Sequence, residues 1–172
     1  MELETAIRER RSVREYAAKD VPQEVIDELI EMAGRAPSAG NLQSRDFIVV
    51  RKRTTKEALA RAAGEQEFVA QAPVVIAVIA NLKRVAPYGE RGRELYAIQD
   101  SAASIQNLLL AIHSKGLGGV WVGAFDEDDA ARILDLPSYA RPVAIIPLGY
   151  PAEKPLPPRL LPSEEFVHSE KW

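Results

Sequence analysis

The 172-residue chain contains no cysteine. This absence excludes disulfides, a thiolate nucleophile and any cysteine-ligated metal or iron–sulfur cluster. Histidine is almost as scarce, and the two present, His113 and His168, have no metal-ligand spacing, so no metal site is expected. Long hydrophobic runs are also missing. The longest, over 73–80, has only the length of a strand, and no membrane partner is expected.

Signals for targeting and for catalysis are equally absent. The first residues, Met1–Glu4, lack the basic and apolar regions of a signal peptide, which predicts a cytoplasmic protein. No Gly-x-Ser-x-Gly motif occurs, and the glycines of 116–119 lead into an expected strand rather than a helix, unlike those of a nucleotide-binding loop. The acidic run over 126–129 is typical of a helix N-terminus rather than of an acid/base pair. If the chain is an enzyme, a bound cofactor therefore performs the chemistry.

Excess positive charge is lacking as well, since the net charge is −3, whereas a general nucleic-acid binder would be basic. Against this background, the segment Arg10–Arg14 places three arginines and Ser12 within five residues. Guanidinium forks and a hydroxyl suit the oxygens of a phosphate. A solvated helix end is the simpler interpretation, but a second polar cluster, Pro37–Gln43, follows the next expected helix. Together the two clusters predict a site for a phosphorylated organic cofactor.

The hydrophobic pattern predicts one domain over 1–172 with alternating helices and strands. Asp20 and Pro22 are start signals for the second helix, and Gly64 and Gly116 are stop signals for the third and fourth. This alternation predicts an α+β fold in which a few-stranded mixed sheet is wrapped by helices. The expected helices cover 2–10, 22–36, 55–63, 94–115 and 126–134, and the expected strands cover 47–50, 73–80, 118–125 and 143–148.

A Pro-rich C-terminal extension over 150–172 has no compact pattern of its own. It carries the apolar residues Phe166, Val167 and Trp172 near its end. These side chains pack either on their own subunit or on a second subunit, and the second arrangement is favoured. The same conclusion is favoured by the expected helix over 94–115, which is apolar around much of its circumference.

The chain resembles the FMN-dependent nitroreductase family. The resemblance runs from Arg10 to Trp172 and rests on an ordered set of motifs rather than on any single one. The motifs are Arg10–Arg14, Ala36–Gln43, the buried strand from Pro73, Gly116–Phe125 and Pro147–Pro151.

The resemblance implies a nitroreductase-like sandwich that is a homodimer, with the tail exchanged between subunits and FMN held at their interface. The activity it implies is that of an FMN-dependent NAD(P)H oxidoreductase. Such an enzyme passes hydride from NADH or NADPH through the flavin to a small acceptor, such as a nitroaromatic or a quinone. The chemistry belongs to the flavin, and no catalytic residue is identified in the chain.

The resemblance also assigns cofactor-binding residues. Arg10 and Ser12 correspond to contacts with the phosphate and ribityl chain, and Arg14 to a cation near the flavin O2/N1 edge. A cation there stabilises the negative charge that develops on reduction. Arg11 of the same motif is a further cofactor-binding residue. Pro37, Ser38 and Ala39 correspond to the loop donated by the other subunit, and Asn41 and Gln43 of the same motif are further cofactor-binding residues. Gly123 and Ala124 correspond to backbone positions that face the flavin N5 region, Arg159 to a tail cation on the phosphate, and Gln66 to a polar flavin contact.

Two alternatives to this enzyme remain open from the residues alone. One is a flavin-binding carrier or sensor without turnover of its own. The other is a basic-patch module that binds phosphopeptides or nucleic acid. For Arg14 itself, the simplest alternative is a surface residue paired with Glu15 or another carboxylate.

Overall fold

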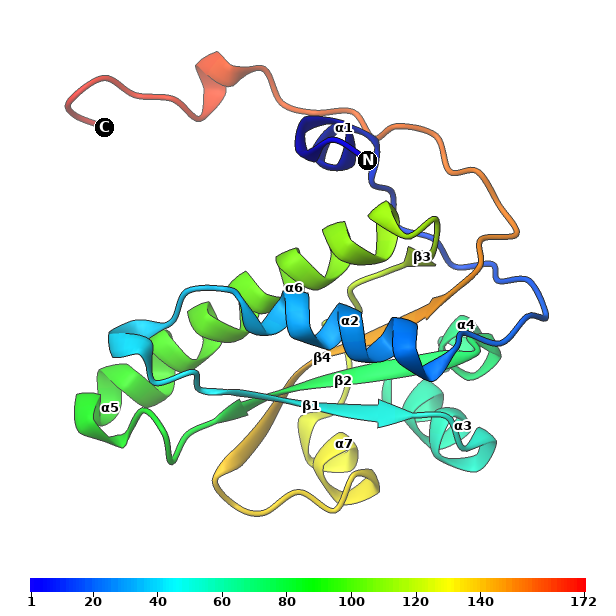
Figure 1. Ribbon diagram of the computed structural model, residues 1–172. Helices are drawn as coiled ribbons and strands as arrows, with labels where there is room; N and C mark the ends of the chain where they lie inside the picture. Colours follow the sequence, from blue (N-terminus) through cyan, green and yellow to red (C-terminus); the bar gives the residue numbers. More distant parts are fainter.

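The computed structural model describes residues 1–172 and contains one four-stranded sheet in the order β1-β2-β4-β3 (Figure 1). All three pairings between these strands are antiparallel, and the only parallel pairing is an isolated bridge between Ser12 and Gly119. The few-stranded sheet is therefore confirmed, but the expected mixed pairing is limited to that bridge. The strands are β1 (Arg45–Val50), β2 (Val74–Asn81), β3 (Gly118–Gly119) and β4 (Ala140–Gly149).

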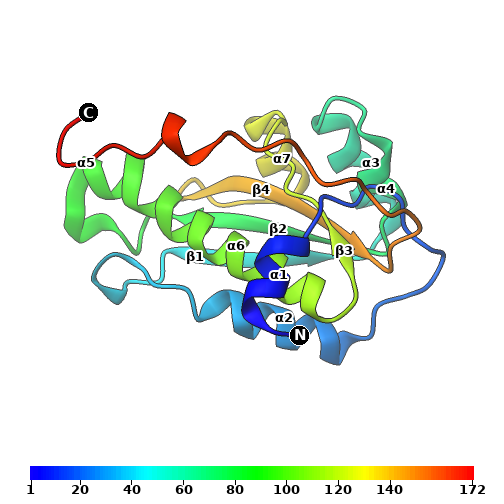
Figure 2. The same cartoon turned by 90° about the horizontal axis from the view of Figure 1, so that it is seen from above.

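Helices cover both faces of this sheet, as Figures 1 and 2 show. α2 and α6 lie on one face, while α3, α4 and α7 lie on the other. This arrangement confirms an α+β fold with the sheet wrapped by helices. None of the helices is both long and apolar enough to cross a bilayer. The helices are α1 (Leu3–Glu9), α2 (Gln23–Gly34), α3 (Arg53–Ala62), α4 (Glu67–Gln71), α5 (Gly89–Arg91), α6 (Ala97–Ser114) and α7 (Glu127–Ile133), with short helical turns η1 (Ala39–Asn41), η2 (Ala86–Tyr88), η3 (Gly92–Tyr96) and η4 (Ser163–Glu165).

The central strand β2 explains why the core has two halves. All eight of its residues are buried. Because alternate side chains of a strand point to opposite faces, Ile76 and Val78 pack in the cluster with α2 and α6. Val75 packs in the second cluster, with α3, α4 and α7. The apolar run over 73–80 is thus a strand covered on both sides, as its sequence predicts.

Most helix boundaries follow the local signals of the sequence. Gly64 and Gly116 take left-handed φ angles of 69° and 72° just beyond α3 and α6. Asp126 caps α7, because its carboxylate accepts a hydrogen bond of 2.8 Å from the N–H of Asp129. Asp20 is an exception. It pairs with Arg51 and caps no helix, while Pro22 holds the N-cap position of α2.

The strand expected over 118–125 is mostly wrong. Only β3 and an isolated bridge between Val122 and Ile145 pair with β4. The interruption is caused by a residue of the neighbouring strand, because Pro147 of β4 lies opposite Val120 and has no N–H to donate. The ladder therefore stops and resumes two residues later. The sequence also gave no sign of α4, whose five residues are too few to show a helical period.

The C-terminal extension contains no buried residue beyond 150. Figure 1 shows it leaving the sheet, passing α1 and ending away from the rest of the chain. Its apolar side chains are largely uncovered, and Trp172 and Leu156 are 102% and 87% exposed. Packing of this segment on its own subunit, one of the two expectations, is not observed.

Candidate functional site

The Arg10–Arg14 segment is an extended stretch that lies along the end of the sheet at β3. The backbone N–H of Val13 donates to the carbonyl of Gly119 over 3.1 Å, next to the bridge between Ser12 and Gly119. Val13 is buried against Gly118, where an added Cβ would lie 2.7 Å from the valine Cβ. The glycine therefore permits the close approach that anchors this segment.

Arg11 differs from the other two arginines of the segment. Its guanidinium turns back to the end of α1 and donates to the carbonyls of Arg8 (2.7 Å) and Arg10 (2.9 Å). These carbonyls lack partners within the helix. Arg11 therefore has a structural role at the C-terminus of α1, in addition to its position beside the cofactor site that the sequence predicts.

Arg10 and Arg14 leave their guanidiniums without any hydrogen bond or ion pair to the chain. The Arg14 guanidinium lies 5.8 Å from the ring centre of Phe68 on α4. The nearby Glu153 accepts a hydrogen bond from the backbone N–H of Arg14 (2.5 Å) and does not pair with its side chain. The alternative of Arg14 as half of a surface ion pair is therefore wrong. The segment and the tail share a hollow of about 270 Å³, lined by Arg10, Arg11, Ser12, Arg14, Pro155, Leu156 and Pro158.

Gln66 and Ala124 meet at the same end of the sheet. The Gln66 side-chain amide donates to the carbonyls of Ala63 (2.6 Å) and Ala124 (3.3 Å). Since Gln66 is the residue just before α4 and Phe68 lies in that helix, the contact places Ala124 on the Arg14 side of the sheet. Gly123 is exposed, and a Cβ added to it would lie 3.7 Å from the indole nitrogen of Trp121.

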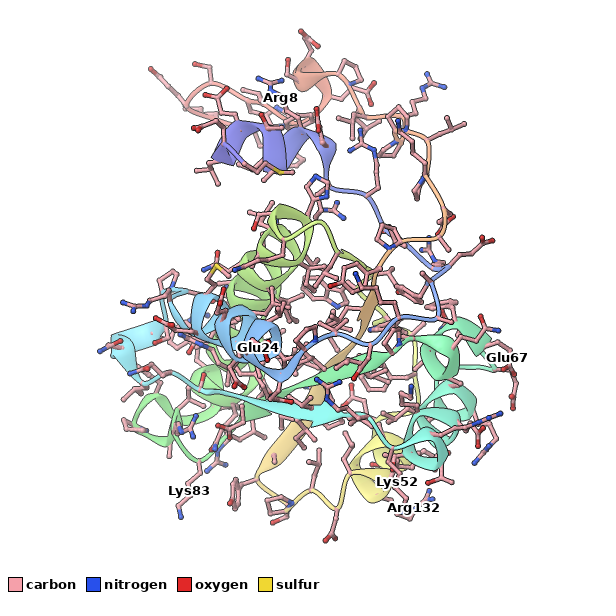
Figure 3. The ribbon with its side chains drawn as sticks, turned by 45° about the vertical axis from the view of Figure 1, so that its right-hand side comes forward. Arg8, Glu24, Lys52, Glu67, Lys83 and Arg132 are labelled. Atoms are coloured by element: carbon pink, nitrogen blue, oxygen red, sulfur yellow. The ribbon has the colours of Figure 1, made fainter.

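The Pro37–Gln43 loop is not part of this cluster within one chain. Figures 1 and 2 show it at the opposite end of the sheet, next to α5. Figure 3 marks the two ends by Glu67, at the start of α4, and Lys83, in the turn after β2. The neighbour of Lys83, Arg84, donates to the carbonyl of Gln43 over 2.8 Å, which ties that turn to the loop.

Arg159 stands apart from both groups. It lies in the exposed extension, and its side chain makes no hydrogen bond or ion pair. Of the residues predicted for the site, one chain thus gathers Arg10, Arg11, Ser12, Arg14, Gln66, Gly123 and Ala124 at one end and Pro37, Ser38, Ala39, Asn41 and Gln43 at the other.

Several residues that shape these two ends could not be identified from the sequence. Glu153 lies in the Pro-rich extension, where no pattern distinguishes it. Phe68 belongs to a helix too short to recognise. Asp100 did carry a signal, because it is an acidic residue on a buried face of α6 beside Ser101 and Ser104.

Two titratable groups near the segment have shifted pKa values because they are buried. Burial lowers the pKa of His113 at the end of α6, and Glu9 opposes this shift. Burial raises the pKa of Tyr16, whose hydroxyl donates to the carbonyls of Val13 (2.7 Å) and Pro147 (3.1 Å). Both shifts favour the neutral form. No group of three or more His, Asp or Glu side chains forms a metal-binding cluster.

Comparisons with known proteins extend the similarity over the whole chain. The model of the Nitroreductase family matches residues 7–68 and 55–150. An NADH dehydrogenase of Thermus thermophilus is 35% identical, over 97% of this chain and 95% of its own. An FMN reductase [NAD(P)H] of Bacillus subtilis is 29% identical, over 97% of this chain and 73% of its own.

A solved structure shows the same fold. The NADPH:FMN oxidoreductase of Vibrio harveyi, determined in complex with NAD⁺, superposes with a TM-score of 0.91. It is 26% identical and covers 99% of this chain and 77% of its own. The motifs, the fold and these matches agree, and the chain belongs to the nitroreductase family.

Proposed function

We propose that the chain is an FMN-dependent NAD(P)H oxidoreductase that acts as a homodimer. The observation that carries this proposal is the pair of unpartnered guanidiniums, Arg10 and Arg14, beside Ser12 at one end of the sheet. Two cations held together without a protein counter-ion favour an anion as ligand. The family relatives named as an FMN reductase and as an NADPH:FMN oxidoreductase identify that anion as FMN.

The residues present fit the phosphate end of FMN. Arg10 and Ser12 supply a guanidinium fork and a hydroxyl for the phosphate and ribityl chain. Arg14 supplies the cation for the pyrimidine edge of the ring, and Glu153 holds its backbone N–H at 2.5 Å. The chemistry that FMN would supply when bound is the uptake of hydride from NAD(P)H and the transfer of that hydride to an acceptor. The buried Tyr16 beside Arg10–Arg14 is not assigned a proton-transfer role, because its hydroxyl is bound to the carbonyls of Val13 and Pro147. Solvent is the proposed source of the proton.

The size of the hollow supports a site completed by a second subunit. Its 270 Å³ lies below the range typical of a pocket for a whole cofactor. The Pro37–Gln43 loop lies too far along the sheet to reach it within one chain (Figure 1). We therefore propose that each site combines Arg10–Arg14 of one subunit with Pro37–Gln43 of the other. Arg159 of the exchanged extension is a third component of this proposal.

The proposal extends to the organisation and setting of the enzyme. Residues 1–172 act as one FMN-binding domain, with 150–172 as the extension exchanged in the dimer. The second substrate is a small-molecule acceptor such as a nitroaromatic or a quinone. The proposed location is the cytoplasm, because the electron donor of the proposed reaction is a nicotinamide nucleotide.

We expect the purified protein to carry non-covalent FMN rather than FAD. The cluster Arg10–Arg14 neutralises one terminal phosphate, and no dinucleotide fingerprint is present to hold an adenosine half. The visible spectrum and the mass of the released flavin measure this directly. Release of mainly FAD contradicts the assignment. Turnover is measured by oxidation of NADH or NADPH with a quinone, and a flavin-loaded protein without turnover indicates the carrier alternative.

FMN is also expected to quench the fluorescence of Trp121. This side chain is 38% exposed, and its indole nitrogen lies 3.7 Å from the position of a Cβ at Gly123. Since Trp172 is the only other tryptophan, a Trp172→Phe variant isolates the signal. Titration of this variant, freed of flavin, should remove most of the emission at one FMN per chain. Emission that persists at saturation would place the ring away from Gly123 and Ala124.

A further inference from the structure

The loop between α2 and β1 has an unfavourable backbone conformation. Gly40, Asn41 and Gln43 have φ angles of 54°, 56° and 50°. Left-handed φ is uncommon for residues other than glycine, and such positions persist only where the surroundings enforce them. They are concentrated at ligand sites. Other parts of the chain must therefore hold the loop in this conformation, and two buried charged side chains do so. The loop residues that remain exposed are available to a ligand.

The first of these side chains is that of Asp100, a residue of α6 that is 4% exposed. One carboxylate oxygen accepts from the backbone N–H of Ala39 over 2.9 Å. The other accepts from the hydroxyl of Ser44 over 2.6 Å. Ala39 precedes the left-handed stretch and Ser44 follows it. A single buried carboxylate thus fixes both ends of the loop to the long helix.

The second of these side chains is that of Arg45, which is 5% exposed. Its guanidinium donates to the carbonyls of Gly34 (2.6 Å) and Ala36 (2.8 Å), at the C-terminus of α2. A weaker contact of 3.4 Å reaches Pro37. Burial lowers the pKa of Arg45, and the charge of Asp100 opposes this shift. The two charged side chains hold different parts of the loop and its preceding turn, and they form no ion pair with each other.

Such an arrangement is costly if stability is its only benefit. Well-packed apolar residues of similar volume stabilise a core as well as buried charges do. What the charges provide instead is a defined position for the backbone on which they act. Because the N–H of Ala39 already donates to Asp100, a ligand would be bound by other polar groups of the loop.

We infer that Asp100 and Arg45 are positioning residues for the cofactor site, because they hold Pro37–Gln43 in the strained conformation that contacts the partner subunit's FMN. This inference rests on the proposed function. It predicts that loss of the Asp100 carboxylate weakens FMN binding much more than it weakens the fold. The two effects are separable because FMN affinity and the stability of the flavin-free protein are measured independently.

The test compares FMN dissociation constants of the full-length chain by titration of flavin fluorescence. Asp100→Asn keeps the shape but leaves only one oxygen to accept hydrogen bonds, and affinity should fall about tenfold or more. Ser44→Ala removes one of the two contacts and should give a smaller loss in the same direction. Ser101→Ala is the matched control. This hydroxyl is also buried on α6, but it donates only to Ala97 within its own helix, so affinity should not change.

Thermal unfolding of the flavin-free proteins and the visible circular dichroism of the bound flavin accompany the titration. Reduced affinity and an altered flavin spectrum in Asp100→Asn, with Ser101→Ala unchanged, support the inference. The inference is overturned if Asp100→Asn binds FMN as tightly as wild type does. It is also overturned if Asp100→Asn and Ser101→Ala lose FMN affinity equally. If Asp100→Asn does not fold, wild-type affinity in Ser44→Ala overturns the inference instead. A wild-type chain that binds no FMN contradicts the proposed function itself.

Discussion

Replacing Arg10 and Arg14 together by glutamine is expected to lower FMN affinity about a hundredfold or more. Each charge-assisted hydrogen bond contributes about 1.5–3 kcal/mol, or roughly ten- to a hundredfold in Kd. Neither guanidinium has a hydrogen-bond or ion-pair partner in the chain, so their removal leaves no carboxylate unpaired and breaks only the cation–π contact of Arg14 with Phe68. The fold should therefore be retained while the cofactor is lost. Fluorescence titration with FMN measures the affinity, and circular dichroism reports the fold.

The single variants should separate the two arginines. Arg10→Gln should weaken FMN binding and leave the reduction potential of the bound flavin unchanged. Arg14→Gln should also lower that potential, by about 30 mV, which corresponds to ~1.4 kcal/mol for a two-electron couple. Arg53→Gln is the charge-matched control, because this arginine pairs with Glu57 on the exposed surface of α3. An affinity change in the control as large as that in either single variant would indicate a general effect of charge.

The fold was largely predictable because its determinants are local. The apolar run over 73–80 identified the central strand, and glycines at 64 and 116 marked the ends of two helices. Failures occurred where a distant residue decides the structure. Pro147 interrupts the ladder of β3 from a neighbouring strand, and nothing within 118–125 records this. The antiparallel pairing of all four strands is likewise a property of connections that periodicity does not reveal.

The candidate site was predictable to the extent that it is continuous in sequence. Arg10–Arg14 and Pro37–Gln43 are each dense clusters in the sequence, and only the two together predicted an anion site. Glu153 and Arg14 are separated by 139 positions, and Asp100 and Ala39 by 61. Such contacts depend on the tertiary structure. The structure also distinguishes arginines that the sequence treats alike, because Arg11 is bound to the end of α1 while Arg10 and Arg14 are not.

In the proposed dimer, the second subunit is expected to cover two regions of exposed apolar surface. One region is the extension, where Leu156, Phe166 and Trp172 are 87%, 61% and 102% exposed. The other is a groove of about 360 Å³ between α1, α2 and α6. Neither region can cover itself, and patches of this kind mark interfaces. The groove is lined by Met1, Leu3, Ala6, Met32, Leu110 and Ala111, together with Arg35, Asn107 and Ser114.

Deleting residues 163–172 is therefore expected to weaken the dimer, the thermal stability and the retention of FMN together. The deletion removes Phe166, Val167 and Trp172, and each such side chain contributes about 1.5–3 kcal/mol when fully buried. A loss of several kcal/mol should lower the melting temperature by more than about 5 °C. Because folding and association are coupled in an obligate dimer, the melting temperature of the intact chain should also rise with protein concentration.

The measurement combines light scattering at micromolar concentration with the flavin content of the purified protein. Phe166→Ser with Val167→Ser is the matched variant of full length, and it should reproduce much of the effect of the deletion. Deleting only 169–172 should have a smaller effect, because it removes a single large apolar side chain, that of Trp172. The strongest contrary result is an intact chain that is a stable, FMN-loaded monomer of 19.0 kDa. One chain would then bind the cofactor without the Pro37–Gln43 loop of a partner, and the site would be limited to the residues around Arg10–Arg14.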